Sequence, residues 1–555
     1  MKKYFIIALA ALGFAACAEK MNDGPSPEQT GEIEQSYIAI NLMSSELDTR
    51  VNTDAPVLED GEEAERQVNS VHFFFFRQGV PFAVNATGSA PGGDKNWLTA
   101  TPNFTEDTED ANISDYSEVT LVLNNYKGQY PDQIVAVINW TPADKEYTLE
   151  MLHAELVTLR GHENGFVMSN SVYMSDSKMI DATAIAESNI GEDANEARKN
   201  AVDIYVERVA AKVKVSTPAA SDADGDWNVE KKWFDTGKTS GLTTLGDAMN
   251  KVYVKINNWS LYNARTQSDL LKTINPAWSD AVLGLTWNDI PRFRSYWADA
   301  DAYTGGTYVN NNNFIWESGN SLGNAEYCGE NTASAETERT KLILKGQLVD
   351  EAGNAFELVK WNGQEMVKVE NLKKAVAAQL KYLVYSYTEN AGEKTYTSIS
   401  DTDLECISGT SQGAPNGVKN YQVYFQLTSD ASDDSKKWAI KSGETYEDKD
   451  AAQINRYLID NIPAATVYAG GQTYYYIDIK HLGTSGKGAE YGIVRNHIYD
   501  IEIQSIKGYG TPVYSPDSNL VKPETPTDDP GVYVAAKINV LSWRVVKQGV
   551  NIEVK

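Results

Sequence analysis

The chain has 555 residues, and its 77 acidic and 49 basic side chains give a formal net charge of −28. This excess of negative charge excludes nucleic acid as a partner, because nothing would neutralise the phosphates. The length predicts two or more domains, and 42% hydrophobic residues with 31 tyrosines and 12 tryptophans predict folded domains and not a disordered chain.

The amino-terminal segment has the pattern of a lipoprotein signal. Two lysines precede an apolar run over 4–16 that is too short to span a membrane as a helix. Small residues stand directly before Cys17, so we predict a signal peptide over 1–17 with lipidation at Cys17. An ordinary signal peptide that happens to contain a cysteine is the alternative. A polar tether follows over 18–34.

The first predicted strand covers 36–47, where Ile38, Ile40 and Leu42 alternate on one face. An acidic loop follows, and Arg50 is isolated within it. The next strand contains four consecutive phenylalanines, which predict that both of its faces are covered, or that one is covered only in an assembly.

The rest of the chain alternates short strands with turn-forming residues, which favours β-sandwich domains. The stretch 217–228 has the composition of a linker between domains, and 510–531 is a proline-rich arm. Further strands are predicted over 118–125, 133–140, 200–216, 251–262, 340–349, 420–428, 473–482 and 497–507. Short helices are predicted over 148–160, 371–385 and 450–461.

No enzyme chemistry is predicted, and neither is a cofactor, a metal site or a catalytic residue. The five histidines have no spacing typical of metal ligands. The G-x-S-x-G pattern around Ser411 lacks the helix of a nucleophile elbow, because Pro415 and Gly417 follow it, so we interpret Ser411 as a turn residue. Cys328 and Cys406 form either one disulfide or two separate thiols, and the second interpretation is preferred, since spacing alone establishes no pair.

Two strands at opposite ends of the chain have similar sequences: 38–44 reads IAINLMS and 536–542 reads AKINVLS. Chance is one explanation, because short strands draw on few residue types. The other is that both strands fit one groove. A sandwich that loses an edge strand exposes backbone groups and apolar surface, and an incoming strand of matching length and face covers both.

The predicted donor segment is 532–555. Its apolar pattern slips at Leu541, which predicts a bulge near Ser542. The donor positions are Ile538, Val540, Leu541, Trp543, Val545, Ile552 and Val554. Burial of about five such side chains contributes on the order of 10 kcal/mol before ordering costs. The alternative is that 534–546 is a fixed strand of its own domain and that only 550–554 is donated.

The order of these features resembles the fimbrillins of type V pili, and most closely the Mfa-type major (shaft) subunit of short fimbriae. The resemblance is strongest in the LGFAAC stretch before the tether, in VRNHIYDIEI and in the last strand. It implies a mainly β protein with a few short helices and two transthyretin-like/Greek-key β-sandwich domains, at 51–220 and 221–509. The arm 510–531 would then lead to a detachable carboxyl-terminal donor strand.

The resemblance also implies a route of assembly. The chain would be exported as an outer-membrane lipoprotein precursor, and an arginine-specific protease would cut Arg50–Val51, with Arg66 as the rival site. Residues 18–50 would leave, and the donor strand of the next copy would fill the groove. This gives a head-to-tail filament.

The same resemblance implies several partners, and two other functions are considered beside it. The implied partners are other copies of the chain, fimbrial anchor and tip subunits, the protease, and host or bacterial surface receptors. The mature form would lie in cell-surface fimbriae that support adhesion and biofilm formation. An accessory or tip adhesin of the same family is one alternative. A surface glycan-binding outer-membrane lipoprotein is another, although it has no use for a releasable first strand.

Overall fold

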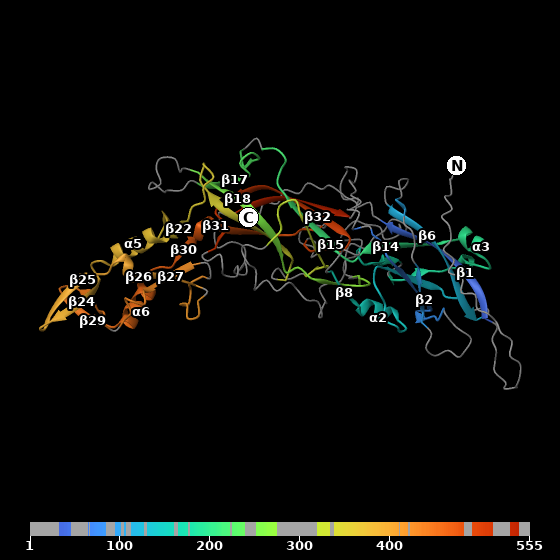
Figure 1. Ribbon diagram of the computed structural model, residues 1–555, viewed down its shortest axis with the longest axis horizontal. Helices are drawn as coiled ribbons and strands as arrows, with labels where there is room; N and C mark the ends of the chain where they lie inside the picture. Colours follow the sequence, from blue (N-terminus) through green and yellow to red (C-terminus); the bar gives the residue numbers. More distant parts are fainter. Residues whose placement is uncertain are drawn as a thin grey trace, which may run out of the picture.

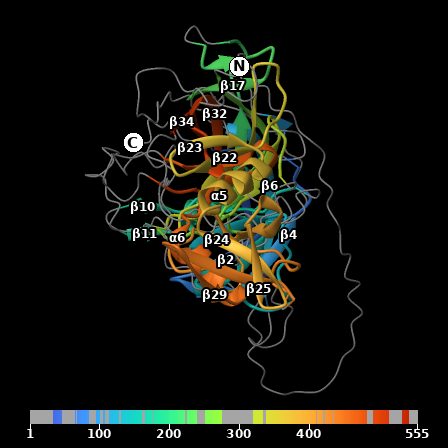
Figure 2. The same cartoon turned by 90° about the vertical axis from the view of Figure 1, so that its left-hand side faces the viewer.

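The computed structural model is an elongated row of three parts (Figure 1). A large sheet lies at one end, a sandwich of two sheets follows, and a module with helices α5 (Val369–Leu380) and α6 (Ala451–Asn461) lies at the other end. Figure 2 looks along this row from the side of the module, whose strands β24 (Val384–Asn390), β25 (Glu393–Ser398) and β29 (Thr445–Lys449) face the viewer.

The structure describes residues 33–513 and 533–542, apart from gaps at 46–64, 66, 85–94, 101–104, 107–112, 127–129, 160–164, 176–177, 222–224, 239–250, 275–318, 334–337, 410, 420–421, 434 and 482–490. Strands predominate in these ranges and the helices are short, so the prediction of a mainly β protein is confirmed. Among the helices that can be described, none has the length and hydropathy needed to cross a membrane.

The first part is one sheet of eleven strands with the path β3-β2-β7-β9-β14-β1-β6-β5. Three short strands join this path from the side, since β4 pairs with β2, β12 with β7 and β13 with β1. The strands are β1 (Ile33–Ser45), β2 (Val71–Arg77), β3 (Val80–Pro81), β4 (Trp97–Ala100), β5 (Thr105–Glu106), β6 (Ile113–Tyr126), β7 (Gln133–Ile138), β9 (Met168–Asn170), β12 (Thr183–Ala184), β13 (Ile190–Gly191) and β14 (Val202–Arg208).

Both faces of this sheet are covered where β2 runs through it. The four phenylalanines alternate between the faces, and all are fully buried. Phe73 and Phe75 lie in a core that the sheet encloses by curving over itself, because residues of β2 and β6 meet there. Phe74 and Phe76 pack on the other face with residues of helix α2 (Leu149–Ala154). The prediction that both faces of this strand are covered is confirmed.

The helix predicted over 148–160 is shorter than expected. α2 starts after Thr148, whose side chain accepts a hydrogen bond from the Met151 amide at 3.1 Å, and covers only the first half of the range. The second half forms β8 (Leu156–Thr158), which pairs with β19 (Gln267–Asp269). The leucine spacing suits a helix, but pairing with a strand distant in sequence decides the structure.

The single strand predicted over 200–216 is in fact two strands in different sheets. β14 belongs to the large sheet, whereas β15 (Ala211–Ser216) belongs to the sandwich. Val209 and Ala210 between them are fully buried, so the chain crosses from one part to the next inside the protein. The stretch 217–228, which has linker composition, comes after this crossing.

The second part is a β-sandwich of a four-stranded and a six-stranded sheet. Their orders are β20-β15-β32-β34 and β16-β17-β18-β21-β31-β33. The remaining bounds are β16 (Trp227–Asn228), β17 (Trp233–Lys238), β18 (Val252–Tyr262), β20 (Ala325–Cys328), β21 (Lys341–Val349), β31 (Gln472–Asp478), β32 (His497–Lys507), β33 (Thr511–Pro512) and β34 (Tyr533–Ser542).

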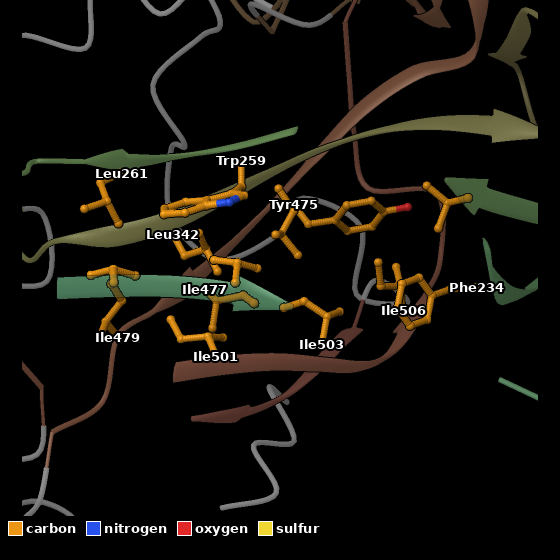
Figure 3. Packing of buried hydrophobic residues seen from close by; sticks show 14 of the residues in the cluster. Phe234, Trp259, Leu261, Leu342, Tyr475, Ile477, Ile479, Ile501, Ile503 and Ile506 are labelled. Carbon is orange, nitrogen blue, oxygen red and sulfur yellow. The ribbon is translucent and has the colours of Figure 1, made fainter. Parts of the chain in front are cut away.

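The core of the sandwich lies between these two sheets. Trp259 of β18, Tyr475 and Ile477 of β31 come from one layer and face Ile501 and Ile503 of β32 in the other layer (Figure 3). Trp259 is fully buried, and its indole nitrogen donates to the Ser321 carbonyl at 3.1 Å. Inward alternation along β31 and β32 supplies this layer of apolar side chains.

The third part is a module inserted between two paired strands of the sandwich, β21 and β31. It has its own hydrophobic core, to which both helices contribute. Its two sheets have the orders β23-β22-β30-β27-β26 and β25-β24-β28-β29. The bounds not yet given are β22 (Leu358–Trp361), β23 (Gln364–Val367), η6 (Asp401–Asp403), β26 (Leu404–Ser408), β27 (Gln422–Leu427), β28 (Lys437–Ser442) and β30 (Ala465–Tyr468). The range 221–509 therefore holds two cores where one sandwich was predicted.

Shorter elements complete the described chain. They are the hairpin β10 (Tyr173–Ser175) and β11 (Lys178–Ile180), the 3-10 helices η2 (Glu187–Asn189) and η7 (Ala469–Gly471), and helix α3 (Ala194–Lys199). The Asp193 side chain caps α3 by accepting hydrogen bonds from two amides of its first turn.

Candidate assembly site

Strand β1 lies inside the large sheet, so the edge position predicted for the first strand is wrong. β1 pairs antiparallel with β6 over 33–45 and parallel with β14 over 40–44. The short strand β13 continues the second side at Tyr37 and Ile38. Removal of β1 would therefore open a slot with two walls, β6 and β14, and each wall would present unpaired backbone groups.

One face of β1 is part of the enclosed core. Ile38 and Ile40 are fully buried and pack with residues of β6 and β14. Leu42, the third predicted position, lies opposite Ile204 of β14. Each fully buried isoleucine contributes about 1.5–3 kcal/mol, so a strand that replaces β1 must supply apolar side chains at the same spacing.

The carboxyl-terminal strand β34 has a different position. Within the described residues it pairs with β32 alone, antiparallel over 533–542, and so it forms the edge of the four-stranded sheet. Ile538 lies opposite Ile501, and Val540 lies opposite Tyr499. In this state the strand belongs to its own subunit, as in the alternative considered from the sequence.

The register of β34 corrects the prediction that its apolar pattern changes face at Leu541. Pairing continues without interruption through Leu541, which lies opposite Ile498, and through Ser542. The irregularity lies nearer the other end of the ladder, where the register shifts between Ile503 and Ser505 of β32. A bulge in the partner strand leaves no signature in the sequence of β34.

Several predicted site residues lie outside the described residues, and their roles stay predictions. They are Cys17, Arg50, Arg66, Trp543, Val545, Ile552 and Val554. The arm is described only as far as residue 513, where β33 pairs with β31.

The residues considered for catalysis or metal binding have structural surroundings. Ser411 lies in a turn, where its amide donates to the Ser408 carbonyl at 2.9 Å. Across the described ranges, no three His, Cys, Asp or Glu side chains are grouped as metal ligands. The rings of His481 and His497 meet edge to face at 5.1 Å, and burial together with His497 lowers the pKa of His481.

The two cysteines are not joined by a disulfide. Cys328 is buried in the sandwich core, whereas Cys406 packs against the core of the module. Burial raises the pKa of the Cys406 thiol to about 12, and it raises the pKa of Cys328 further. The interpretation as two separate thiols is confirmed.

Charged side chains that the sequence analysis did not single out are buried near the crossing from β14 to β15. The Arg495 guanidinium donates to Glu330 at 2.7 Å and to the Asp269 carbonyl at 2.7 Å. Lys272 forms a second buried ion pair, with Glu207, at 2.8 Å. A charged residue inside an apolar strand, such as Glu207, is the signal that the sequence offers for such a cluster.

Residues 466–549 match the family model described as major fimbrial subunit protein type IV, fimbrillin, C-terminal. The matched stretch contains β31, β32 and β34 of the sandwich. The match confirms the resemblance to the fimbrillins and supports the role of a fimbrial subunit at the cell surface. Such a role is structural and not enzymatic.

Two solved structures are similar to the chain over most of its length. A fimbrilin from Porphyromonas gingivalis W83 is 13% identical with a TM-score of 0.37, over 94% of this chain and 99% of that chain. The tip fimbrial protein Mfa3 from Porphyromonas gingivalis is 12% identical with a TM-score of 0.30, over 92% of this chain and 100% of that chain. A search of curated proteins finds no match.

Proposed function

We propose that the chain is a shaft subunit of a cell-surface fimbria and that it polymerises head to tail by donor-strand exchange. The contrast between β1 and β34 carries this proposal. β1 lies between two strands with its apolar side in a core, whereas β34, which is similar in sequence, lies at an edge. The filament would support adhesion and biofilm formation.

The pairing of the two strands supplies a driving force for exchange. In its own subunit β34 forms one ladder of backbone hydrogen bonds, with β32. In the slot of a neighbour it would form two ladders, one with β6 and one with β14. Each additional hydrogen bond contributes about 0.5–1.5 kcal/mol net, so the two ladders gained outweigh the single ladder lost at β32.

The same geometry would keep the precursor monomeric. While β1 fills the slot, its backbone and its buried isoleucines satisfy both walls, and no second strand fits. The precursor would reach the outer membrane as a lipoprotein anchored through Cys17. An arginine-specific protease would then cut Arg50–Val51 and release β1 with residues 18–50.

The mature subunit would have several partners. Its slot would receive the donor strand of one copy, and its own donor strand would enter the slot of another. Fimbrial anchor and tip subunits would end the filament, and host or bacterial surface receptors would bind it.

The test of this proposal is a reversible lock on the donor strand. Glu502 of β32 and Lys537 of β34 lie opposite each other, so replacing both with cysteine places two thiols within reach of a disulfide. After arginine-specific cleavage, the reduced variant should form filaments in electron microscopy and the oxidised variant should not. The matched control replaces Glu389 and Lys394, which lie opposite each other in the module, and should polymerise in both states.

Two other outcomes have clear meanings. If the oxidised Glu502/Lys537 variant polymerises as fast as the reduced one, β34 stays in its own sheet and only the segment after it is donated. If release of β1 yields no filaments from any variant, the proposed function is wrong.

A further inference from the structure

A buried carboxylate lies beside the rival cleavage site, in the segment that follows β1. Glu65 is 1% exposed, although its neighbours in sequence are mostly polar. Its carboxylate accepts a hydrogen bond from the Lys212 ammonium at 2.5 Å and another from the Tyr327 hydroxyl. A carboxylate is buried in this way only where such partners compensate for the lost water.

The partners of Glu65 come from both sides of the crossing between the large sheet and the sandwich. Lys212 of β15 and Tyr327 of β20 lie opposite each other in the ladder, so they present their side chains together. Arg208, the last residue of β14, donates from Nε to the Glu65 carbonyl at 3.2 Å. Glu65 is therefore fixed by its backbone to one sheet and by its side chain to the other.

The chain is also fixed on the other side of Arg66. The Asn139 side chain donates to the Gln67 carbonyl at 2.7 Å and to the Phe166 carbonyl at 2.9 Å. The same side chain accepts a hydrogen bond from the Asn69 amide at 2.8 Å. Both sequence neighbours of Arg66 thus have backbone carbonyls that are hydrogen-bonded within the fold.

We infer that Glu65 is a positioning residue for maturation, which holds the chain on the carboxyl side of the cleavage point and directs hydrolysis to Arg50–Val51 instead of Arg66–Gln67. This inference rests on the proposed function. In the reaction, water adds across the Arg50–Val51 peptide bond and leaves a carboxylate on Arg50 and an amine on Val51. Glu65 itself takes no part in the chemistry.

The physical reason is the free energy needed to open the segment. A protease binds several residues around the cut bond in extended form, so the Arg66 bond is cut only when Glu65 and Gln67 have left their partners. Opening of the segment would also separate the Glu65 carboxylate from the Lys212 ammonium, whose side chain is 1% exposed. After a cut at Arg50, by contrast, the Glu65 contacts stay in the mature subunit and tie its new amino-terminal segment to β15.

The experiment measures the Arg66 bond directly. Arg50→Gln in the full-length precursor removes the preferred site, and the precursor is then treated with an arginine-specific protease. Amino-terminal sequencing follows the appearance of a chain that begins at Gln67. We expect slow cutting in this background and cutting about tenfold faster or more when Glu65→Gln is added, because a charge-assisted contact no longer holds the segment closed.

Three further measurements separate local opening from loss of the fold. Tyr327→Phe removes one hydrogen bond to Glu65 and should accelerate the cut less than Glu65→Gln. Glu187→Gln, at an exposed carboxylate of η2, should leave it unchanged. Cutting after Arg495, which is 1% exposed and paired with Glu330, reports unfolding of the sandwich, and its rate should be the same in all variants.

Equal rates at Arg66–Gln67 with and without Glu65→Gln would overturn the inference. So would a wild-type precursor that is cut first after Arg66. Neither result depends on filament formation. Failure of the mature subunit to polymerise would count against the proposed function alone, whereas the rates of cutting at Arg66–Gln67 decide whether Glu65 is a positioning residue.

Discussion

Glu326 and Lys345 show how far burial shifts the pKa values of individual charged groups in the sandwich. Burial raises the pKa of Glu326 to about 7, although Asn320 donates to its carboxylate at 2.7 Å and favours the charged form. Burial lowers the pKa of Lys345 to about 8, and attraction to Glu326 opposes part of this change. Both groups therefore titrate closer to neutral pH than they do in water.

This shift predicts a specific dependence of stability on pH. Because the pKa of Glu326 is higher in the folded state than its ordinary value of 4.5, its contribution to stability is complete below pH 4.5 and is lost as the pH rises through about 7. Between pH 5 and pH 7.5, the free energy of unfolding of wild type should fall by about 2 kcal/mol relative to Glu326→Gln. Urea unfolding of both proteins at the two pH values measures this difference. Parallel curves for the two proteins would contradict it.

The limits of sequence reasoning at this scale are clear from Glu65. The burial of Ile38 and Ile40 follows from alternation, and that of the four phenylalanines follows from their uninterrupted run, and both are local patterns. The partners of Glu65 come from three separate strands, and its neighbours suggest an exposed loop. No local pattern carries that information, because contacts between distant segments are created by the fold.

Helix α6 illustrates an element whose ends are specified by local chemistry. The Asp450 side chain accepts from the Gln453 amide at 2.7 Å, and the Gln453 side chain accepts from the Asp450 amide at 3.0 Å. This capping box satisfies two amide groups at the start of the helix. The helix predicted over 450–461 is confirmed, because α6 covers Ala451–Asn461.

Removal of this cap should destabilise the helix measurably. Asp450→Ala should lower the stability of the module by about 1 kcal/mol, because the amides of the first turn lose their acceptor. Amide hydrogen exchange in α6 measures the change. Asp460→Ala is the control on the same helix, since Asp460 forms only an exposed ion pair with Arg456, and it should change exchange by at most about 0.5 kcal/mol. Equal effects of the two substitutions would argue against the cap.

Most strands could be predicted from alternation, but their neighbours in the sheets could not. β2, β18, β21 and β32 lie where the apolar pattern places them. The interior position of β1 and the division of 200–216 into β14 and β15 depend on pairing between segments far apart in the chain. The apolar pattern over 200–216 predicts one strand although the chain crosses from one sheet to another there. The residues on both sides of Val209 are equally buried, so the pattern does not mark the crossing.

On the scale of the whole molecule, the inserted module has a sharp boundary. Leu358 and Tyr468 lie opposite each other in β22 and β30, and both belong to the sandwich core. Their chain neighbours Val359 and Val467 are also paired, but they belong to the core of the module. The chain therefore leaves the sandwich and returns to it at one point.

This boundary predicts that the module can be removed. Deletion of 359–467, with Leu358 joined to Tyr468 through an Asn-Gly turn, should leave a folded protein that unfolds in a single transition, because a two-residue turn connects directly opposed strands. Calorimetry and circular dichroism measure this outcome. The module expressed alone should fold as well, since it has its own core. Aggregation of both fragments would show that the two cores depend on each other.

Because the module is attached at one point, the surface that it presents is separate from the strands proposed to join the subunits. β1 and its slot lie at the opposite end of the row from β24, β25 and β29 (Figure 1). In a filament built as proposed, each subunit would carry the module as a side appendage at a regular interval, and its sequence could diverge without altering the joint between subunits. A foreign domain whose two ends lie close together could take its place, and the shaft would then present that domain once per subunit along its length.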